Sequence, residues 1–382
     1  MKKICLFIYF IILIEVILKL LNYFNNKILI VSTFYINYQD GIIRRGLFGS
    51  ILHFFSKYTF INPFKFQIIF FLIVIIVLFY LIIRGFYKHK IEFYILFGSF
   101  MLLNVIAFNM FFFIDIFFIV FFVLQMYVIN KIDNINTKLI VVNLMSIFMI
   151  LNHEAYFIFT FFPILYLLNV NSFSVENVRK IVLLSPSFIV FLLMGLYFNG
   201  RGVDANVIID SWKCFGEEYL DQISKLYWTF NSTDEVIIWK ISIFKNNPIY
   251  LVGFFINIVL IFLCMLIYLN DNFKSNSKYI FTFLLFQYFA IILISLIAID
   301  YVRWFWLANI ITIFTLFNVN SNMGFLKQIN INISNRISFI NRFIILFIGL
   351  PLGGSWSPTQ FIYTMPIKHF FDFGNRVLSL FS

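Results

Sequence analysis

The sequence predicts an all-α, polytopic integral membrane protein, and three observations support that prediction. Hydrophobic residues make up 62% of the chain and charged residues only 12%, whereas a soluble domain carries about 25% charged residues. Apolar runs of about twenty residues, the length that spans a bilayer as a helix, recur along the sequence. The longest polar stretch is 199–248. Residues 1–382 are therefore expected to form a single transmembrane domain, with no soluble domain.

The apolar runs predict about eleven helices. The first run follows Met1-Lys2-Lys3 and resembles a signal peptide, but no small-x-small cleavage site follows it, so we expect it to remain as the first helix. The predicted helices fall at 4–24, 64–83, 93–112, 115–130, 139–152, 155–170, 181–198, 249–269, 279–298, 304–319 and 340–352.

The segment 139–170 is too long for one ordinary span and short for two. Its centre carries Asn152, His153 and Glu154. A single tilted helix would place the Glu154 carboxylate in mid-bilayer, where a charge costs several kcal/mol. We therefore expect two short re-entrant or broken helices, with the turn at Asn152–Glu154 toward the outer face.

The charges of the connecting segments predict the orientation. With the N-terminus in the cytoplasm, the inner side carries fourteen basic residues against four acidic ones, and the outer side thirteen against twelve. Short basic loops on the cytoplasmic side are typical of membrane proteins. The inner connections are 84–92, 131–138, 171–180, 270–278 and 320–339. The net charge of +11 thus reflects loop asymmetry, and no nucleic-acid partner is expected.

The first predicted extracytoplasmic loop, 25–63, holds the densest polar cluster. It contains Asp40, the adjacent Arg44 and Arg45, and an expected interfacial helix at Leu47–Phe55. Paired arginines suit phosphate, because each guanidinium donates two parallel hydrogen bonds and stays protonated. The cluster therefore favours an anion clamp beside a carboxylate. The alternative is a juxtamembrane basic pair ahead of the interfacial helix.

Three further clusters lie on the predicted outer side. His153 and Glu154 interrupt apolar helix, and ionisable residues in such places mark functional sites by default; alternatively, Glu154 pairs with an arginine or lysine to fix helix packing. Asp300, Arg303 and Trp304 form either a further anion contact or an interfacial ion pair beside a tryptophan belt. The large extracytoplasmic loop 199–248, with Trp212, favours a saccharide surface or a solvated amphipathic connector.

Other chemistry has little support in the sequence. The three cysteines are far apart, so neither a disulfide framework nor a metal site is expected. No Walker loop, Rossmann glycine fingerprint or nucleophile elbow occurs. These observations argue against ATP-driven and nicotinamide chemistry, and no cofactor is expected.

The polar residues of the outer side together suit a glycosyltransferase with a polyprenyl-(di)phosphate donor. Arginines bind the phosphate, a carboxylate deprotonates the attacking hydroxyl, and fixed cations stabilise the departing phosphate. The expected base is Glu154 or Asp40, with His153 orienting or sharing the proton. The expected diphosphate ligands are Arg44, Arg45 and Arg303, and the expected glycan contacts are Asp300, Trp212 and Trp304.

The layout resembles the bacterial O-antigen and surface-polysaccharide polymerases and related polyprenyl-phosphate-dependent membrane glycosyltransferases. The resemblance is carried by Asp40 with Arg44-Arg45-Gly46-Leu47, by His153-Glu154, and by Asp300 with Arg303-Trp304. It implies a multi-pass protein of the bacterial inner membrane with a periplasmic active face. It also implies a polyprenyl-diphosphate-linked oligosaccharide as substrate and a chain-length regulator as partner.

Two alternative functions remain open. The first is a transferase that adds one sugar from a polyprenyl-monophosphate donor; that family often shows a paired acidic motif in the first outer loop, where this chain has the single Asp40. The second is a transporter or flippase for lipid-linked glycans. A flippase should place charges along a path open to both sides, whereas the charges here cluster on one side.

Overall fold

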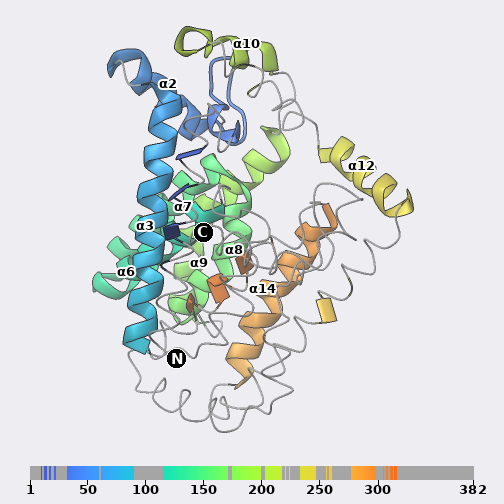
Figure 1. The fold of residues 1–382 in the computed structure, drawn as a ribbon. Helices are drawn as coiled ribbons and strands as arrows, with labels where there is room; N and C mark the ends of the chain where they lie inside the picture. The colour runs from blue at the N-terminus through green and yellow to red at the C-terminus, as the bar shows by residue number, and fades with distance from the viewer. Residues whose placement is uncertain are drawn as a thin grey trace, which may run out of the picture.

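All regular secondary structure in the described part of the chain is helical (Figure 1). The computed structural model describes residues 32–59, 62–89, 115–170, 174–198, 203–216, 233–246 and 277–297, with isolated positions between 10 and 22 and between 220 and 315. The elements are η1 (Ser32–Tyr35), α2 (Gly46–Thr59), α3 (Pro63–His89), α6 (Asp115–Lys131), α7 (Ile135–Asn152), α8 (Ala155–Leu167), α9 (Val175–Leu192), the π-helical turn η3 (Leu193–Tyr197), α10 (Ala205–Asp210), η4 (Lys213–Phe215), α12 (Thr233–Asn246) and α14 (Ser277–Ile297).

Several predicted helices occur close to the expected places. Helices α3, α6 and α14 correspond to the predictions at 64–83, 115–130 and 279–298, and a helix does follow Arg45, as α2. The helix expected at 181–198 begins earlier, because the Ser174 hydroxyl accepts from the Asn177 N–H and caps α9 at Val175. The predictions at 4–24, 93–112, 249–269, 304–319 and 340–352 lie wholly or mostly outside the described residues.

Two described helices are long and apolar enough to cross a membrane. They are Ile135–Asn152 and Val175–Tyr197, the second of which joins α9 to η3. Shorter apolar helices are found at Pro63–Val77, Ile116–Lys131, Ala155–Leu167 and Thr282–Ile294. By length and composition alone, a membrane protein with at least these two spans is compatible with the described part of the chain.

The predicted break within 139–170 is confirmed. Helix α7 ends at Asn152 and α8 begins at Ala155. Between them His153 is extended, with φ −165° and ψ 113°, while its N–H still donates to the Met149 carbonyl. The extended residue turns the chain, so the His153–Glu154 pair lies at the junction of two helices and not inside one.

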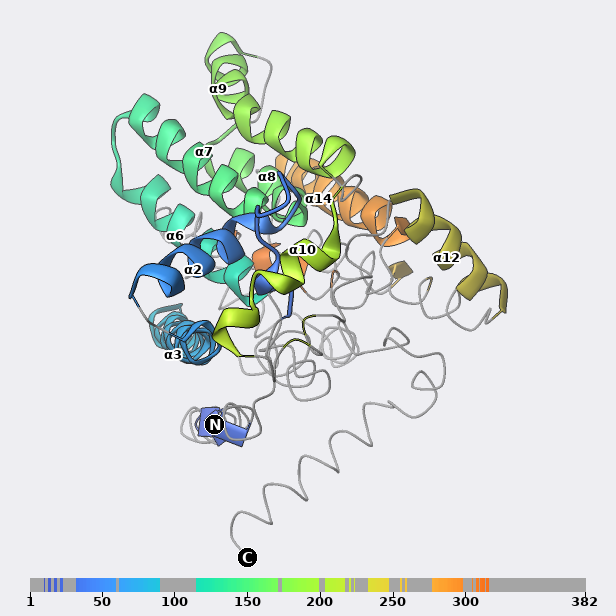
Figure 2. The ribbon, with the colours of Figure 1, turned by 90° about the horizontal axis from the view of Figure 1, so that it is seen from above.

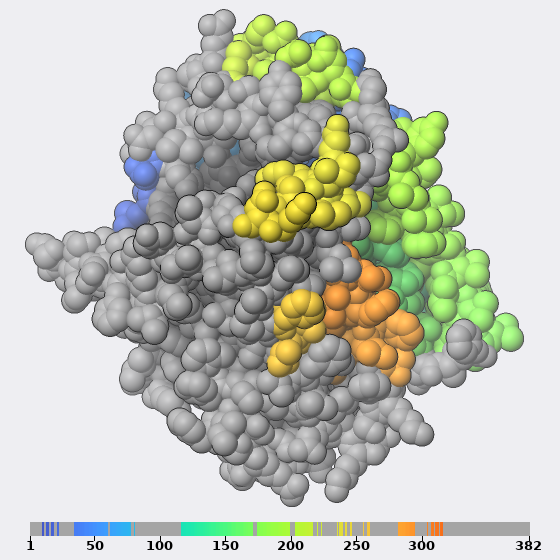
Figure 3. Space-filling view, turned by 90° about the vertical axis from the view of Figure 1, so that its right-hand side faces the viewer, coloured from blue at the N-terminus to red at the C-terminus, as the bar shows by residue number. Residues whose placement is uncertain are grey.

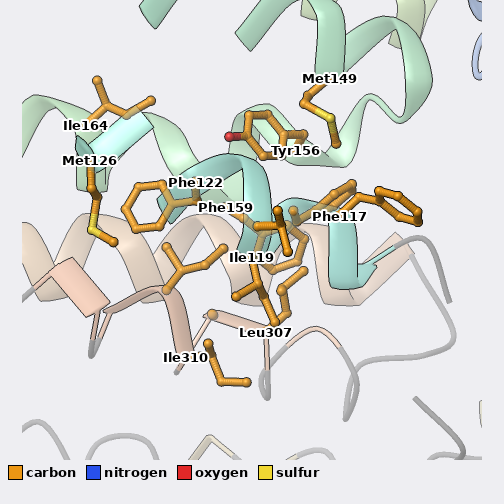
Figure 4. Packing of buried hydrophobic residues seen from close by; sticks show 14 of the residues in the cluster. Phe117, Ile119, Phe122, Met126, Met149, Tyr156, Phe159, Ile164, Leu307 and Ile310 are labelled. Atoms are coloured by element: carbon orange, nitrogen blue, oxygen red, sulfur yellow. The ribbon is translucent and has the colours of Figure 1, made fainter. Parts of the chain in front are cut away.

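The main core lies where α6, α7, α8 and α14 pack together. Phe118 and Phe122 of α6, Phe159 of α8 and Leu284 of α14 are each at most 1% exposed. Figure 4 shows aromatic and aliphatic side chains of α6, α7 and α8 converging, together with Leu307 and Ile310. Helix α12 lies across the surface beside α14 (Figure 3).

A buried proline explains one contact between α14 and α8. Pro163 lies inside α8 and has no N–H to donate to the Phe159 carbonyl four residues earlier. The fully buried Gln287 of α14 fills that role, since its Nε2 donates to the Phe159 carbonyl at 2.9 Å. The side chain of one helix thus replaces the missing backbone bond of the other.

The variant Gln287→Leu is expected to lower the free energy of unfolding by about 1–3 kcal/mol, because it leaves the Phe159 carbonyl buried without this donor. Pro163→Ala supplies a backbone N–H that can donate to the Phe159 carbonyl. Gln287→Leu should therefore lower the free energy of unfolding less in the Pro163→Ala background than in the wild type. Unfolding of the detergent-solubilised protein as a double-mutant cycle measures the coupling. Equal losses from Gln287→Leu with and without Pro163 would contradict this explanation.

A second, smaller cluster lies at the end of the molecule where α2 and α10 are found (Figures 1 and 2). We call it the loop core; its residues are Tyr35, Ile36, Ile43, Leu52, Phe64, Ala205, Ile208, Ile209, Trp212 and Ile223. Asn37 Nδ2 donates to Ser211 Oγ at 2.9 Å, so the two predicted outer loops are also joined by a polar contact. The loops 25–63 and 199–248 therefore share one hydrophobic core within the described residues.

Candidate functional site

The Arg45 side chain reaches across 109 residues of sequence to the turn between α7 and α8. Its Nε donates to Glu154 Oε2 at 3.2 Å and its Nη2 to Oε1 at 2.7 Å, which is a bidentate arginine–carboxylate pair. Arg44 Nη1 lies 3.8 Å from the same Oε1 atom. All three side chains are 13–14% exposed. The structure therefore brings together three of the residues that the sequence singled out: Arg44, Arg45 and Glu154.

The backbone ahead of α2 sets the direction of the two arginines. The Arg44 N–H donates to the Phe198 carbonyl at 2.9 Å, which fixes the loop against the end of η3. Arg45 has φ +67°, a left-handed conformation that is uncommon for a residue with a Cβ. Such strain costs about 1–3 kcal/mol and persists only where the surroundings hold it. The bidentate pair with Glu154 is one contact that holds it here.

Close packing beneath α2 requires glycine. A Cβ on Gly49 would lie 2.0 Å from the Ile36 carbonyl oxygen, so no larger residue fits without moving the backbone of the loop. The α2 helix can consequently approach η1 closely, and its first turn is held next to the arginine pair. Gly49 is thus a structural requirement of the site.

His153 joins the turn to the core. Its ring packs edge-on against Phe118, with centroids 5.3 Å apart, and it is 3% exposed. Its Nδ1 accepts from the Ala155 N–H at 3.3 Å. An accepting Nδ1 carries no proton, so it does not donate to the Glu154 carboxylate 3.7 Å away. The arrangement favours the neutral Nε2–H tautomer, with His153 orienting the turn.

The electrostatics favour an ionised Glu154. Burial by itself raises the pKa of this carboxyl, but the positive charges of Arg45 and Arg44 together hold the pKa well below its usual range. Burial lowers the pKa of Arg44 and the Glu154 carboxylate opposes that shift; arginine nevertheless remains charged at neutral pH. Among the described charged groups of this site, two guanidinium groups thus face one carboxylate, an arrangement that suits an anion.

A carboxylate held in this way is a weak proton acceptor. General bases work best when their pKa lies near the working pH, and that of Glu154 lies far below it. Glu154 was expected to act as the base. The geometry instead favours a positioning role, in which Glu154 holds the two arginines in place. This role matches the alternative inferred from the sequence, in which Glu154 pairs with an arginine or lysine to fix helix packing. In the structure its partners are Arg44 and Arg45, which are also the candidate phosphate ligands.

Asp40 lies in a different contact from the ion pair. Its Oδ2 accepts from the backbone N–H of Asp204, the residue that caps α10. Asp40 therefore links the first loop to the large loop, and its side chain remains partly exposed. Asp300 and Arg303 lie outside the described residues.

The two tryptophans predicted to bind glycan are used in packing. Trp212 is 0% exposed and donates from Nε1 to the Tyr35 carbonyl at 2.8 Å, so its faces are not available to stack on a sugar in this structure. Its burial is explained by the loop core, in which it packs edge-on against Tyr35. Trp304 is partly buried against Phe159, with ring centroids 5.4 Å apart.

Two polar groups near the site belong to residues that were not among the predicted site residues. The Tyr38 hydroxyl and Asn152 Oδ1 are buried and have no hydrogen-bond partner in the described part of the chain. Burial raises the pKa of Tyr38 to about 12, so the phenol stays protonated. The Tyr38 ring covers Gly46, the first residue of α2. In the sequence, Tyr38 stands directly before the Asp40–Arg45 stretch and Asn152 directly before His153, and these positions are the signals that could have indicated the two groups.

Metal-binding groups do not gather at this site. Among the residues that the structure describes, no three His, Cys, Asp or Glu side chains come together in a way that could hold an ion. The positive charge that the described site offers to a ligand comes from the two guanidinium groups.

Comparisons with known proteins give no relative from which a role could be transferred. No model of a protein family matches the chain, and neither a curated protein nor a solved structure matches it.

Proposed function

We propose that this chain is a polytopic glycosyltransferase of the bacterial inner membrane that polymerises lipid-linked oligosaccharide repeat units at the outer face. The observation that carries the proposal is the Arg44–Arg45–Glu154 cluster, in which two arginines are fixed side by side on one carboxylate. A fixed pair of guanidinium groups suits a diphosphate, because it offers charge and directed donors at once. The apolar composition suits a substrate that arrives through the lipid.

The proposal places three segments on the periplasmic side: the loop 25–63, the turn at His153–Glu154 and the loop 199–248. Contacts between them support a shared side. Arg45 pairs with Glu154, and Trp212 donates to the Tyr35 carbonyl. Segments that contact one another through buried side chains cannot lie on opposite faces of a bilayer, so an orientation that separates them is disfavoured.

The proposed reaction is a transfer of the growing glycan to the next repeat unit. A hydroxyl oxygen of the acceptor sugar attacks the anomeric carbon of the donor glycan, and the bond from that carbon to the diphosphate oxygen breaks. The electron pair stays on the diphosphate, whose charge Arg44 and Arg45 stabilise. Asp40 takes the hydroxyl proton, and Arg303 and Asp300 complete the diphosphate and glycan contacts. Glu154 and His153 hold the arginines and the turn in place.

An assay with isolated membranes tests the proposal. Membranes that contain the protein, given a polyprenyl-diphosphate-linked repeat unit, should form a ladder of longer lipid-linked glycans and release the free polyprenyl diphosphate. Extension by one sugar from a polyprenyl-monophosphate donor would instead identify a single-sugar transferase. Movement of the lipid-linked glycan across sealed vesicles without any new glycosidic bond would identify a flippase, and would overturn the proposal.

The topology makes a separate prediction. In a cysteine-free background, Ser232→Cys in the large loop should react with a membrane-impermeant maleimide added from outside, whereas Asn272→Cys in an inner connection should react only after the membrane is opened. The physical reason is the charge asymmetry of the loops. Labelling of position 272 but not 232 from outside would reverse the orientation and remove the basis for a periplasmic active face.

A further inference from the structure

We propose that the exposed aromatic face of α2 inserts into the headgroup region of the outer lipid leaflet, and that this anchor holds Arg44 and Arg45 at the depth of the lipid phosphates. The inference rests on the membrane placement given under the proposed function, but it does not depend on glycosyl transfer. It assigns to α2 a partner of stated chemistry, an anionic phospholipid surface.

Helix α2 has two distinct faces. Gly46, Gly49, Leu52 and Ser56 recur every three or four residues and are buried against the rest of the molecule. On the other side, large aromatic side chains are exposed. Phe54 is 59% exposed, Phe55 54% and Tyr58 64%. Three exposed aromatic side chains on one helix are costly in water, so the face is expected to be covered by something apolar.

The charges around this face identify the partner. The exposed Lys57 lies between Phe55 and Tyr58 in sequence, and the exposed Lys65 follows at the start of α3. No acidic residue occurs between Asp40 and Glu92. A helix with aromatics on one face and lysines but no acids at its edge is typical of helices that lie in the interface of an anionic membrane. A second protein would need acidic side chains at matching positions, whereas an anionic phospholipid leaflet presents negatively charged phosphates over its whole surface.

The neighbouring helix supports the same placement. Helix α3 begins at Pro63, only a few residues after α2 ends, and its N-terminus is capped by Asn62, whose Oδ1 accepts from the Phe64 and Lys65 N–H groups. The cap and the proline at the first helical position fix where α3 begins. Along α3 the exposed residues Ile69 and Ile73 continue an apolar surface away from α2. Lipid that covers α3 would therefore meet α2 at its headgroup level.

The anchor has a consequence for the arginines. Helix α2 begins at Gly46, directly after Arg44 and Arg45. A helix that lies in the interfacial plane keeps both of its ends near the same depth, so the guanidinium groups lie beside phosphate groups instead of above the membrane. A lipid-linked diphosphate then reaches the pair by lateral diffusion, without leaving the leaflet.

Depth measurement on the full-length protein tests the inference. The native cysteines are replaced, and a single nitroxide is placed at Phe55→Cys in protein reconstituted into vesicles of phosphatidylethanolamine and phosphatidylglycerol. We expect the label to collide with dissolved oxygen far more than with a water-soluble nickel chelate. The matched control is Asp210→Cys on α10, an exposed position whose ion pair with Lys213 lies at the surface; its label should show the opposite preference.

Each result separates the alternatives. Equal nickel access at positions 55 and 210 would place α2 in water, and low access of both reagents at position 55 would show that protein covers it, either a second copy or a partner; both results overturn the inference. In vesicles of phosphatidylcholine alone, the label at position 55 should move toward water if the lysines act on anionic lipid. None of these readings requires glycan synthesis, so the anchor and the proposed function can fail independently.

Discussion

Replacement of Arg45 by lysine is expected to reduce glycan polymerisation by about 10²-fold or more, the cost of removing one directed donor from a site that stabilises developing charge. Lysine keeps the positive charge but has no planar fork, so it cannot reproduce the two parallel bonds that Arg45 makes to Glu154 at 3.2 and 2.7 Å. Lysine still places a positive charge beside the Glu154 carboxylate, so protein abundance should change little. The measurement is the glycan ladder, read beside the amount of protein in the membrane.

The control for Arg45→Lys is Arg179→Lys. Arg179 is exposed and donates to Asn136 Oδ1 at 2.9 Å, far in sequence from the site. Its replacement should leave both the ladder and the protein level unchanged. Wild-type chain length in an Arg44→Ala, Arg45→Ala double variant would show that the pair serves membrane insertion or packing and not the substrate.

Replacement of Glu154 by glutamine is expected to affect stability and activity together. Gln keeps the shape but removes the charge that compensates two neighbouring guanidinium groups. Breaking a buried pair by removing one partner costs about 3–5 kcal/mol, and the 14% exposure of these side chains argues for the lower part of that range. Thermal unfolding and polymerisation should therefore both fall, and Glu154→Asp should recover part of each because it restores the charge.

The pH dependence distinguishes positioning from general-base catalysis. The folded-state pKa of Glu154 lies below its unfolded value, so its stabilising contribution is complete above about pH 5 and is lost as the pH falls through the folded pKa. A positioning role predicts that the polymerisation rate of the wild type shows no titration of Glu154 between pH 5 and 8. The opposite outcome would be a wild-type rate that titrates in that range and a Glu154→Gln variant that keeps wild-type stability but no longer shows the titration. That result would identify Glu154 as the general base.

The sequence predicted those features of the site that follow from the free-energy cost of burying polar residues within one segment. A histidine and a glutamate within apolar residues cannot continue one buried helix cheaply, and the break indeed falls between Asn152 and Ala155. The basic residue that pairs with Glu154 could not be identified in the same way. Any arginine or lysine would satisfy the carboxylate, and Arg45 lies 109 residues away. The choice is made by the packing of α2 against η1 and by the hold of Phe198 on Arg44.

The large loop shows the limit of reading composition. Its mixture of acids, amides and aromatics suggested a saccharide surface or a solvated amphipathic connector, and the helices α10 and α12, which form within it, were not among the predicted elements. Trp212 looked like a sugar-stacking residue because tryptophan is amphipathic. Its burial depends on a hydrophobic surface supplied by Tyr35 and Leu52, which lie more than 150 residues earlier. No periodicity within 199–248 could reveal that surface.

The distance in sequence between the residues of the loop core determines how late during translation this core can form. Tyr35 meets Trp212 after a further 177 residues. At about 5–20 residues per second on the ribosome, the first loop waits about 9–35 s for the segment that covers it. Glu154 is synthesised 109 residues after Arg45, so it becomes available to Arg45 within that interval, whereas Trp212 reaches Tyr35 only at its end. Nascent chains arrested before residue 212 should therefore expose the first loop to a protease added outside, and chains arrested well after the loop core closes should protect it.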